Sequence, residues 1–256
     1  MCLILFSYKN HSDYDLILAS NRDEFRDRPT AKLEFWEDFP DVLAGRDLIN
    51  GGTWMGITRT GRFAALTNFR SLPMIKQDSP SRGNLVKDFL CGNMSASDYI
   101  QKLKPIAASY SGFNLIFGNM DALFYFSNCN QEIQTISSGL FGLSNNFLNV
   151  PWPKVERGKH LFSECMEKDS EPDIKQIFTL LSDQSYPERH QLPRTGISME
   201  WEQMLSPIFI DNSFYGTRSQ SILSIKTNGY ISFYERTIHA DNIRKGSIRK
   251  RSFQIS

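Results

Sequence analysis

The sequence predicts an α+β fold in which packed sheets are flanked by helices. Three observations lead to this prediction. Segments of strand and helical character follow one another in blocks, as strands, helices, strands, helices and strands, rather than alternating one by one. The chain has 256 residues, of which 40% are hydrophobic, enough for a substantial core. An Asn228-Gly229 pair between two β-rich runs is a strong hairpin signal.

The first third of the chain is rich in strands. Apolar runs at residues 3–7 and 16–20 are joined by a polar turn, so we expect two neighbouring antiparallel strands. The second run leads into a densely charged segment, residues 21–28. A Thr-Gly turn then separates residues 55–58 from residues 63–67, which predicts a further hairpin.

The first helical block follows this hairpin. Helices are expected at residues 84–90 and 98–104, where apolar residues recur at helical spacing. Either Ser95 or Ser97 is suited to be the N-cap of the second helix, and Pro105 is expected to end it.

The remaining chain repeats the pattern of strands, helices and strands. A second helical block is expected at residues 153–166 and 174–181, followed by a polar, proline-containing loop or lid at 182–198. The further strands are predicted at residues 113–117, 123–127, 131–136, 140–143, 221–226 and 230–235. Because no internal repeat is present, we predict one domain over residues 1–236 and a basic C-terminal extension over residues 237–256.

Composition argues against several classes of function. The net charge is +1, so no overall field attracts nucleic acid. The four cysteines are widely spaced and no histidine has metal-ligand spacing, which argues against a metal site and a disulfide framework. Since neither a signal peptide nor a membrane-spanning run is recognisable, we expect a cytoplasmic protein.

Cys2 directly follows the initiator methionine and opens an apolar run. If Met1 is removed, Cys2 carries a thiol and a free α-amine, whose unperturbed pKa is about 7.7–8.0. A nucleophile beside its own base suits covalent catalysis without a histidine. The alternative is that Cys2 is a small buried residue at the start of a strand.

The charged segment at the end of the second strand also indicates a site at Cys2. Antiparallel neighbours bring Arg22 and Asp23 within reach of Cys2. An arginine favours the thiolate, and a carboxylate can hold an N-terminal ammonium. The alternative is a local turn with a surface salt bridge.

Other polar residues stand at the ends of apolar runs. Asn68, Asn145 and Asn146 are candidates for stabilising an oxyanion, although asparagine is also a common turn residue. Arg218 is suited to support a thiolate or to bind a substrate carboxylate or phosphate, and is otherwise an ordinary exposed arginine. The glycines around Trp54 match no phosphate-binding pattern and indicate tight turns near a pocket.

A series of short segments, in order along nearly the whole chain, resembles the NRDE family, also called the transport and Golgi organisation protein 2 family. They are Met1-Cys2, Asn21–Phe25 with Arg28-Pro29, Gly45–Asp47, Gly51–Trp54, Leu66–Asn68, Ser81–Gly83, Gly112–Leu115, Gly142–Asn145, Pro151–Lys154 and Tyr215–Arg218. That family in turn resembles the cysteine branch of the N-terminal-nucleophile hydrolases, the group with penicillin V acylase and bile salt hydrolase.

The resemblance implies a four-layer αββα sandwich of two antiparallel sheets. The catalytic residues that it implies are Cys2, Arg22, Asp23, Asn68, Asn145 and Arg218. Glu24, Trp54 and Asn146 are expected to contact the substrate, an amide or thioester, and the hydrolase needs no cofactor. Arg22 and Asp23 are adjacent here but further apart in the acylases, which leaves open whether Asp23 or Glu24 meets the amine.

The resemblance also implies a second class of function. Members of the family are linked to the secretory pathway, to lipid and coenzyme A metabolism and to haem movement. A non-catalytic carrier that binds haem or an acyl thioester in the same pocket is therefore the alternative to a hydrolase. A scaffold for membrane traffic, relying on the basic extension, is a third.

Overall fold

The computed structural model describes residues 2–166, 171–238 and 246–255, and the chain divides into two compact units. Unit 1 comprises Met1–Asp27 and Ser137–Ser252, and unit 2 comprises Arg28–Ile136 and Phe253–Ser256. Met1 and part of the predicted basic extension, residues 239–245, lie outside the described residues.

Unit 1 is built on a six-stranded sheet with the order β10-β1-β2-β11-β12-β13 among the described residues. The strands are β1 (Cys2–Tyr8), β2 (Tyr14–Phe25), β10 (Gly139–Leu143), β11 (Tyr215–Lys226), β12 (Tyr230–Thr237) and β13 (Ile248–Gln254). β1 pairs antiparallel with β2 and β10, and β11 pairs antiparallel with β2 and β12. The strand β2 therefore has a hydrogen-bonded neighbour on each side.

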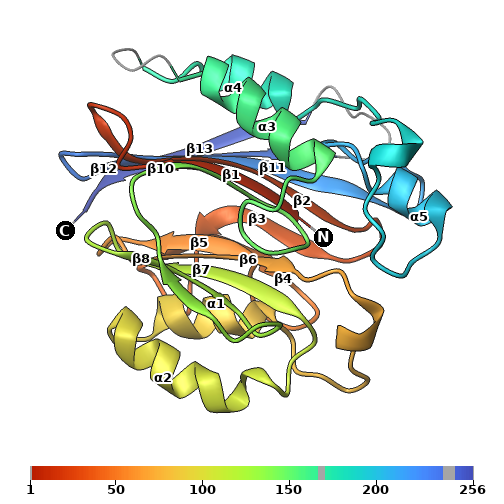
Figure 1. The fold of residues 1–256 in the computed structure, drawn as a ribbon. Helices are drawn as coiled ribbons and strands as arrows, with labels where there is room; N and C mark the ends of the chain where they lie inside the picture. The colour runs from red at the N-terminus through yellow and green to blue at the C-terminus, as the bar shows by residue number, and fades with distance from the viewer. Residues whose placement is uncertain (1, 167–170, 239–245, 256) are drawn as a thin grey trace. The chain divides into compact units, whose positions relative to one another are not determined.

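Two helices, α3 (Pro153–Glu164) and α4 (Ile174–Leu180), cover one face of this sheet (Figure 1). Because side chains alternate along a strand, every second residue of β1 and β2 faces them. The core on this face includes Leu3, Leu5, Ile17, Ala19, Phe162, Ile177 and Ile222. The turn η2 (Arg189–Gln191) and the helix α5 (Met199–Met204) belong to the segment that leads to β11.

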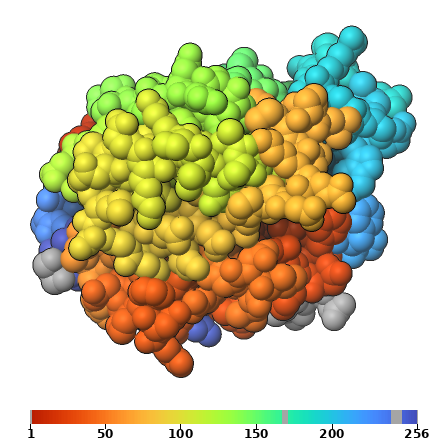
Figure 2. All heavy atoms as spheres, turned by 90° about the horizontal axis from the view of Figure 1, so that it is seen from below, coloured from red at the N-terminus to blue at the C-terminus, as the bar shows by residue number. Residues whose placement is uncertain are grey.

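Unit 2 is built on a seven-stranded sheet with the order β3-β4-β5-β6-β7-β8-β9, in which each strand pairs antiparallel with the next. The strands are β3 (Thr30–Phe35), β4 (Val42–Asp47), β5 (Met55–Thr58), β6 (Phe63–Asn68), β7 (Phe113–Gly118), β8 (Leu123–Ser127) and β9 (Ile133–Thr135). The turn η1 (Leu72–Met74) and the helices α1 (Gly83–Cys91) and α2 (Ala96–Ala107) lie between β6 and β7. The helices, yellow in Figure 2, pack their apolar side chains on the sheet.

These two antiparallel sheets and their helices confirm the predicted fold class. Several boundaries differ from the prediction. The second strand continues beyond residue 20 to Phe25, because β1 pairs with it as far as Arg22 and β11 pairs with it as far as Phe25. The helix α2 continues past Pro105 to Ala107, since a proline in the last turn removes a single hydrogen bond.

Four elements lie where the sequence shows no clear pattern. The strands β3 and β4 are short and half polar, and α5 lies just after the predicted loop at 182–198. β13 lies within the predicted basic extension, next to β12 in the sheet. None of the helices among the residues that the structure describes is long and apolar enough to cross a membrane.

Candidate functional site

The candidate site begins with one row of residues across the sheet of unit 1. Cys2 in β1 lies directly opposite Arg22 in β2, which lies directly opposite Ser219 in β11. Residues opposite one another point to the same face of a sheet. Leu3 and Leu5 point to the face covered by α3 and α4, so Cys2 points to the other face. The thiol is buried, and only 5% of Arg22 is exposed.

The buried thiol is a weak nucleophile in its resting form. Burial raises the pKa of the Cys2 thiol above its ordinary value, and the nearby Asp23 carboxylate raises it further. The Arg22 guanidinium and the backbone N–H of Asp23 act in the opposite direction, because both favour the thiolate. Burial is the largest of these effects, so the thiol is protonated at neutral pH and needs a base.

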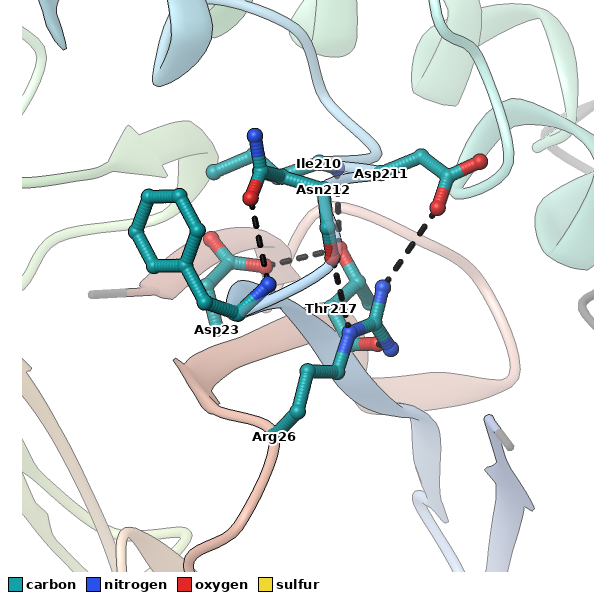
Figure 3. Close-up of polar contacts among 7 residues, drawn as sticks. Asp23, Arg26, Ile210, Asp211, Asn212 and Thr217 are labelled. Carbon is teal, nitrogen blue, oxygen red and sulfur yellow. Dashed lines mark hydrogen bonds and ion pairs between the residues drawn. The ribbon is translucent and has the colours of Figure 1, made fainter. Parts of the chain in front are cut away.

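Asp23 is the more firmly held of the two candidate carboxylates. It is 1% exposed, and its Oδ1 accepts a hydrogen bond of 2.8 Å from the Thr217 hydroxyl (Figure 3). The Tyr215 hydroxyl donates to the Asp23 backbone carbonyl at 2.9 Å. Glu24 is half-buried, and its carboxylate accepts from the backbone N–H of Phe25 at 3.0 Å. These contacts hold Asp23 more firmly than Glu24.

Asn145 follows β10, the strand on the other side of β1. Leu143 lies opposite Ile4 in an antiparallel pair. Asn145 is two residues further along the chain, on the same face, and therefore lies near Cys2. Asn145 is fully buried, and the Ser144 hydroxyl donates to the Cys2 carbonyl at 3.2 Å. Asn146 is half-buried, and its side-chain oxygen accepts from the backbone N–H of the next residue.

Arg218 lies at an irregularity in the pairing of β2 with β11. The register shifts between Thr217 and Ser219, and this bulge redirects the side chain of the extra residue. The guanidinium of Arg218 donates to the Phe25 carbonyl at 2.6 Å. Burial lowers the pKa of Arg218, and the positive charges of Arg22 and Arg26 lower it further. Three arginines therefore act on one another at this end of the two strands.

Two of the predicted site residues, Asn68 and Trp54, belong to unit 2. Asn68 is half-buried at the end of β6, opposite Phe113. Trp54 is half-buried before β5, and a Cβ atom at Gly45 would lie 2.4 Å from its ring. The glycine at position 45 therefore gives the indole room within unit 2. The structure brings the other predicted residues of the site together in unit 1.

The sequence analysis gave no role to several residues that hold this site. Thr217, Tyr215 and Arg26 all contact the region around Asp23 through hydrogen bonds. Asn21 is fully buried and its amide donates to the carbonyls of Leu181 and Ile208, at 2.8 and 2.7 Å. The signal for Asn21 and Arg26 is their place beside Arg22 and Asp23 in the charged segment. Among the described residues, no three His, Cys, Asp or Glu side chains gather as a metal site.

Comparison with a family model and with known sequences points to one family. The family model for "Transport and Golgi organisation 2" matches residues 1–240. A mouse protein named "Transport and Golgi organization 2 homolog" is 34% identical over 258 residues, covering 93% of each chain. The human homologue is 31% identical and covers 100% of this chain and 99% of its own. A Drosophila melanogaster member is 28% identical, covering 93% of this chain and 92% of its own.

Comparison with solved structures supports the fold. A Caenorhabditis elegans orthologue of N-acylethanolamine-hydrolyzing acid amidase has a TM-score of 0.52 and 11% identity, covering 87% of this chain and 92% of its own. The C2A mutant of conjugated bile acid hydrolase from Clostridium perfringens also has a TM-score of 0.52 and 11% identity, with 100% and 98% covered. At this identity the likeness concerns the fold alone.

Proposed function

Because the chain belongs to the transport and Golgi organisation 2 family and has the fold of N-terminal-nucleophile hydrolases, we propose that it is a cysteine hydrolase or acyltransferase acting on an amide or thioester bond. The observation that carries this proposal is the row in which Cys2 lies opposite Arg22, next to a buried and firmly held Asp23. A thiol, a cation and a carboxylate at one strand end are the groups that this chemistry needs.

The proposed reaction begins with removal of Met1, which leaves an α-amine on Cys2. The amine takes the thiol proton, directly or through a water molecule, and Asp23 holds the resulting ammonium. The thiolate attacks the substrate carbonyl, and the amide of Asn145 stabilises the oxyanion. The bond to the leaving amine or thiol breaks as the ammonium returns a proton to it. Water or another acceptor then takes the acyl group from Cys2.

The electrostatics of Cys2 explain why the amine matters. A thiol whose pKa is raised by burial supplies little thiolate at neutral pH, so Arg22 alone does not activate it. An amine with an unperturbed pKa of about 7.7–8.0 is a base of suitable strength at that pH. Glu24 and Asn146 are proposed as substrate contacts, and Arg218 as the binding partner of a polar or anionic group.

A paired experiment tests this function. The mass of the native N-terminus establishes whether Met1 is present, and a p-nitrophenyl acyl ester then serves as the acyl donor. We expect native protein without Met1 to form an acyl-enzyme on Cys2, and Cys2→Ala to form none. The matched control is Cys165→Ala, since Cys165 is another buried thiol of unit 1. Full activity of Cys2→Ala, or native protein that retains Met1, would contradict the proposal.

The second candidate is a non-catalytic carrier of haem or an acyl thioester. Two observations favour it: the relatives are named for transport, and the buried Cys2 thiol is protonated at neutral pH. A haem titration followed by absorbance separates the two functions, because a carrier of haem gives a Soret shift and a hydrolase gives none. A carrier of acyl thioesters would bind the thioester without releasing free thiol.

We also propose a reducing compartment, such as the cytoplasm, for this chemistry. The four cysteines, Cys2, Cys91, Cys129 and Cys165, form no disulfides. In such a compartment a nucleophilic thiol stays reduced.

A further inference from the structure

The carboxylate of Asp23 is held by a chain of hydrogen bonds that begins far away in the sequence. The backbone N–H of Ile210 donates to the Thr217 hydroxyl at 3.0 Å, and the backbone N–H of Thr217 donates to the Ile210 carbonyl at 2.9 Å. Because a carboxylate oxygen only accepts, the Thr217 hydroxyl donates its proton to Asp23 Oδ1 at 2.8 Å (Figure 3). The hydroxyl therefore holds the carboxylate in one orientation.

Arg26 holds the segment that carries this threonine. Its guanidinium donates to the backbone carbonyls of Asn212 and Thr217, both at 3.1 Å, and approaches the Asp211 carboxylate at 3.5 Å. Its own backbone N–H donates to the Phe214 carbonyl at 2.9 Å. The Arg26 side chain is only 11% exposed, so its bonds to the two carbonyls are partly shielded from water, whereas the Asp211 side chain is 40% exposed. Arg26 thus binds both the turn before β11, at Asn212, and the first part of β11, at Thr217.

Gly216 makes this arrangement possible. A Cβ atom at this position would lie 2.6 Å from the Arg26 guanidinium and 2.6 Å from the Ile210 carbonyl oxygen. No side chain fits between the arginine and the turn, so the two segments approach one another closely only with glycine here. The glycine, the arginine and the threonine therefore form one unit around Asp23, which we call the Asp23 clamp: Arg26, Gly216 and Thr217.

We propose that Arg26 and Thr217 are positioning residues, which fix the Asp23 carboxylate beside Cys2 so that it holds the α-amine of the nucleophile. The inference rests on the proposed function for the role of the amine. The hydrogen bonds that carry it lie entirely within unit 1. Arg26 and Thr217 do not touch the reacting atoms in this scheme; they act through Asp23.

The alternative is that the Asp23 clamp only stabilises the fold. The two roles differ in what they do to Cys2. Among the described residues, the charged groups that act on the Cys2 thiol are Arg22 and Asp23. A displaced Asp23 no longer opposes ionisation of the Cys2 thiol and no longer stabilises the α-ammonium. The thiol and the ammonium therefore both lose their protons at lower pH. If the Asp23 clamp only stabilised the fold, its loss would change the stability of the protein and leave the titration of Cys2 unchanged.

The experiment measures the rate at which iodoacetamide alkylates Cys2 between about pH 5 and about pH 10, by peptide mass mapping. We expect Asp23→Asn to move the midpoint to lower pH by about one unit, and Thr217→Val to move it the same way by about half a unit. Thr217→Ser retains the hydroxyl and is expected to keep the native midpoint. Arg26→Lys is expected to shift it like Thr217→Val, because an ammonium does not bind both carbonyls as a guanidinium fork does.

Two controls keep the test specific. Thr58→Val removes another buried threonine hydroxyl, which accepts from the Arg62 backbone N–H in unit 2, and is expected to leave the midpoint unchanged. The double variant Asp23→Asn/Thr217→Val is expected to shift the midpoint no further than Asp23→Asn alone, since one residue acts through the other. Variants that fail to fold are recognised by thermal melting. In that case the difference in alkylation midpoint between Thr217→Val and Thr217→Ser decides whether Thr217 positions Asp23.

The possible results separate this inference from the proposed function. A native midpoint in Thr217→Val, an additive double variant, or no shift in Asp23→Asn would each overturn the positioning role. If the midpoints shift as expected but Cys2 accepts no acyl group from the p-nitrophenyl ester, the proposed function fails and the positioning of Asp23 stands. Because alkylation reports on the thiol directly, it gives a result whether or not the protein turns over a substrate.

Discussion

Single buried amides in this protein act as donors to backbone carbonyls. Asn21 is the strongest example, because its side-chain NH₂ donates to the carbonyls of Leu181 and Ile208. These two bonds join β2 to both ends of the segment 182–207. The residue precedes Arg22 directly, so the same bonds also restrain the strand that carries the site. Its importance depends on hydrogen-bond polarity and not on size.

We predict that Asn21→Asp destabilises the protein by about 2–4 kcal/mol. The substitution keeps the shape of the side chain but turns an acceptor toward two buried carbonyls. The free energy of unfolding in urea measures the effect. Asn228→Asp is the matched control, because Asn228 uses its side-chain oxygen to accept from the Tyr230 backbone N–H, which an aspartate also does. Equal stability of the two variants would contradict the assigned polarity.

Two other cysteines test how burial acts on thiols in this molecule. Burial raises the pKa of Cys91 and Cys165 to about 11 in each case. At pH 8 each is then less ionised than an unperturbed thiol of pKa about 8.5, by a factor on the order of a hundred. We predict that iodoacetamide alkylates both at least that much more slowly than free cysteine at pH 8. The rate should rise tenfold per pH unit up to about pH 11; a rate near that of free cysteine at pH 8 would refute the prediction.

At the scale of elements, helix caps and strand pairings determine where the local structure ends. The sequence leaves Ser95 and Ser97 as alternative N-caps of the second helix, and the structure selects Ser95. Its side-chain oxygen accepts from the backbone N–H of Asp98 at 3.1 Å, and α2 begins at Ala96. Ser97 then lies inside the first turn.

We predict that Ser95→Ala lowers the free energy of unfolding by about 1 kcal/mol, because the first turn of α2 loses the partner of one backbone N–H. Ser97→Ala is expected to be neutral or slightly stabilising, since alanine has the higher helix propensity. Urea denaturation of both variants measures the difference. The assignment of the cap fails if Ser97→Ala is the more destabilising of the two.

The element scale also shows what the sequence predicts and what it does not. Cys2 and Arg22 are predicted neighbours because one short turn joins their strands, and this register is local. The pairing of Asp23 with Thr217 joins residues 194 positions apart, and nothing in either segment specifies that register. Arg26 binds backbone carbonyls, which every residue has, so its role leaves no side-chain pattern to recognise. Family resemblance supplied Asn145 and Arg218, which composition alone left open.

At the scale of the whole molecule, the end of the chain belongs to the packed structure. β13 lies beside β12 in its sheet, and Phe253 belongs to the same compact unit as Phe35 and Arg59. The Phe253 ring lies 5.5 Å from the Phe35 ring and 5.7 Å from the Arg59 guanidinium. The segment that the sequence suggests is an extension therefore contributes packed side chains.

We predict that truncation after residue 246 lowers the melting temperature, because it removes β13 and the aromatic contacts of Phe253 together. The substitution Phe253→Ala, which keeps β13, separates the two losses and is expected to have the smaller effect. Differential scanning calorimetry measures both. A truncated chain that melts with the full-length protein would show that the terminal strand adds no stability.

The burial of Cys2 has a consequence for the lifetime of the protein. Peroxide attacks the thiolate, and oxidation then passes through sulfenic acid to forms that cells do not readily reduce. A thiol kept protonated by its surroundings presents little of that target, and disulfide exchange is slowed for the same reason. The environment that makes Cys2 dependent on a neighbouring base also makes it durable under oxidative stress.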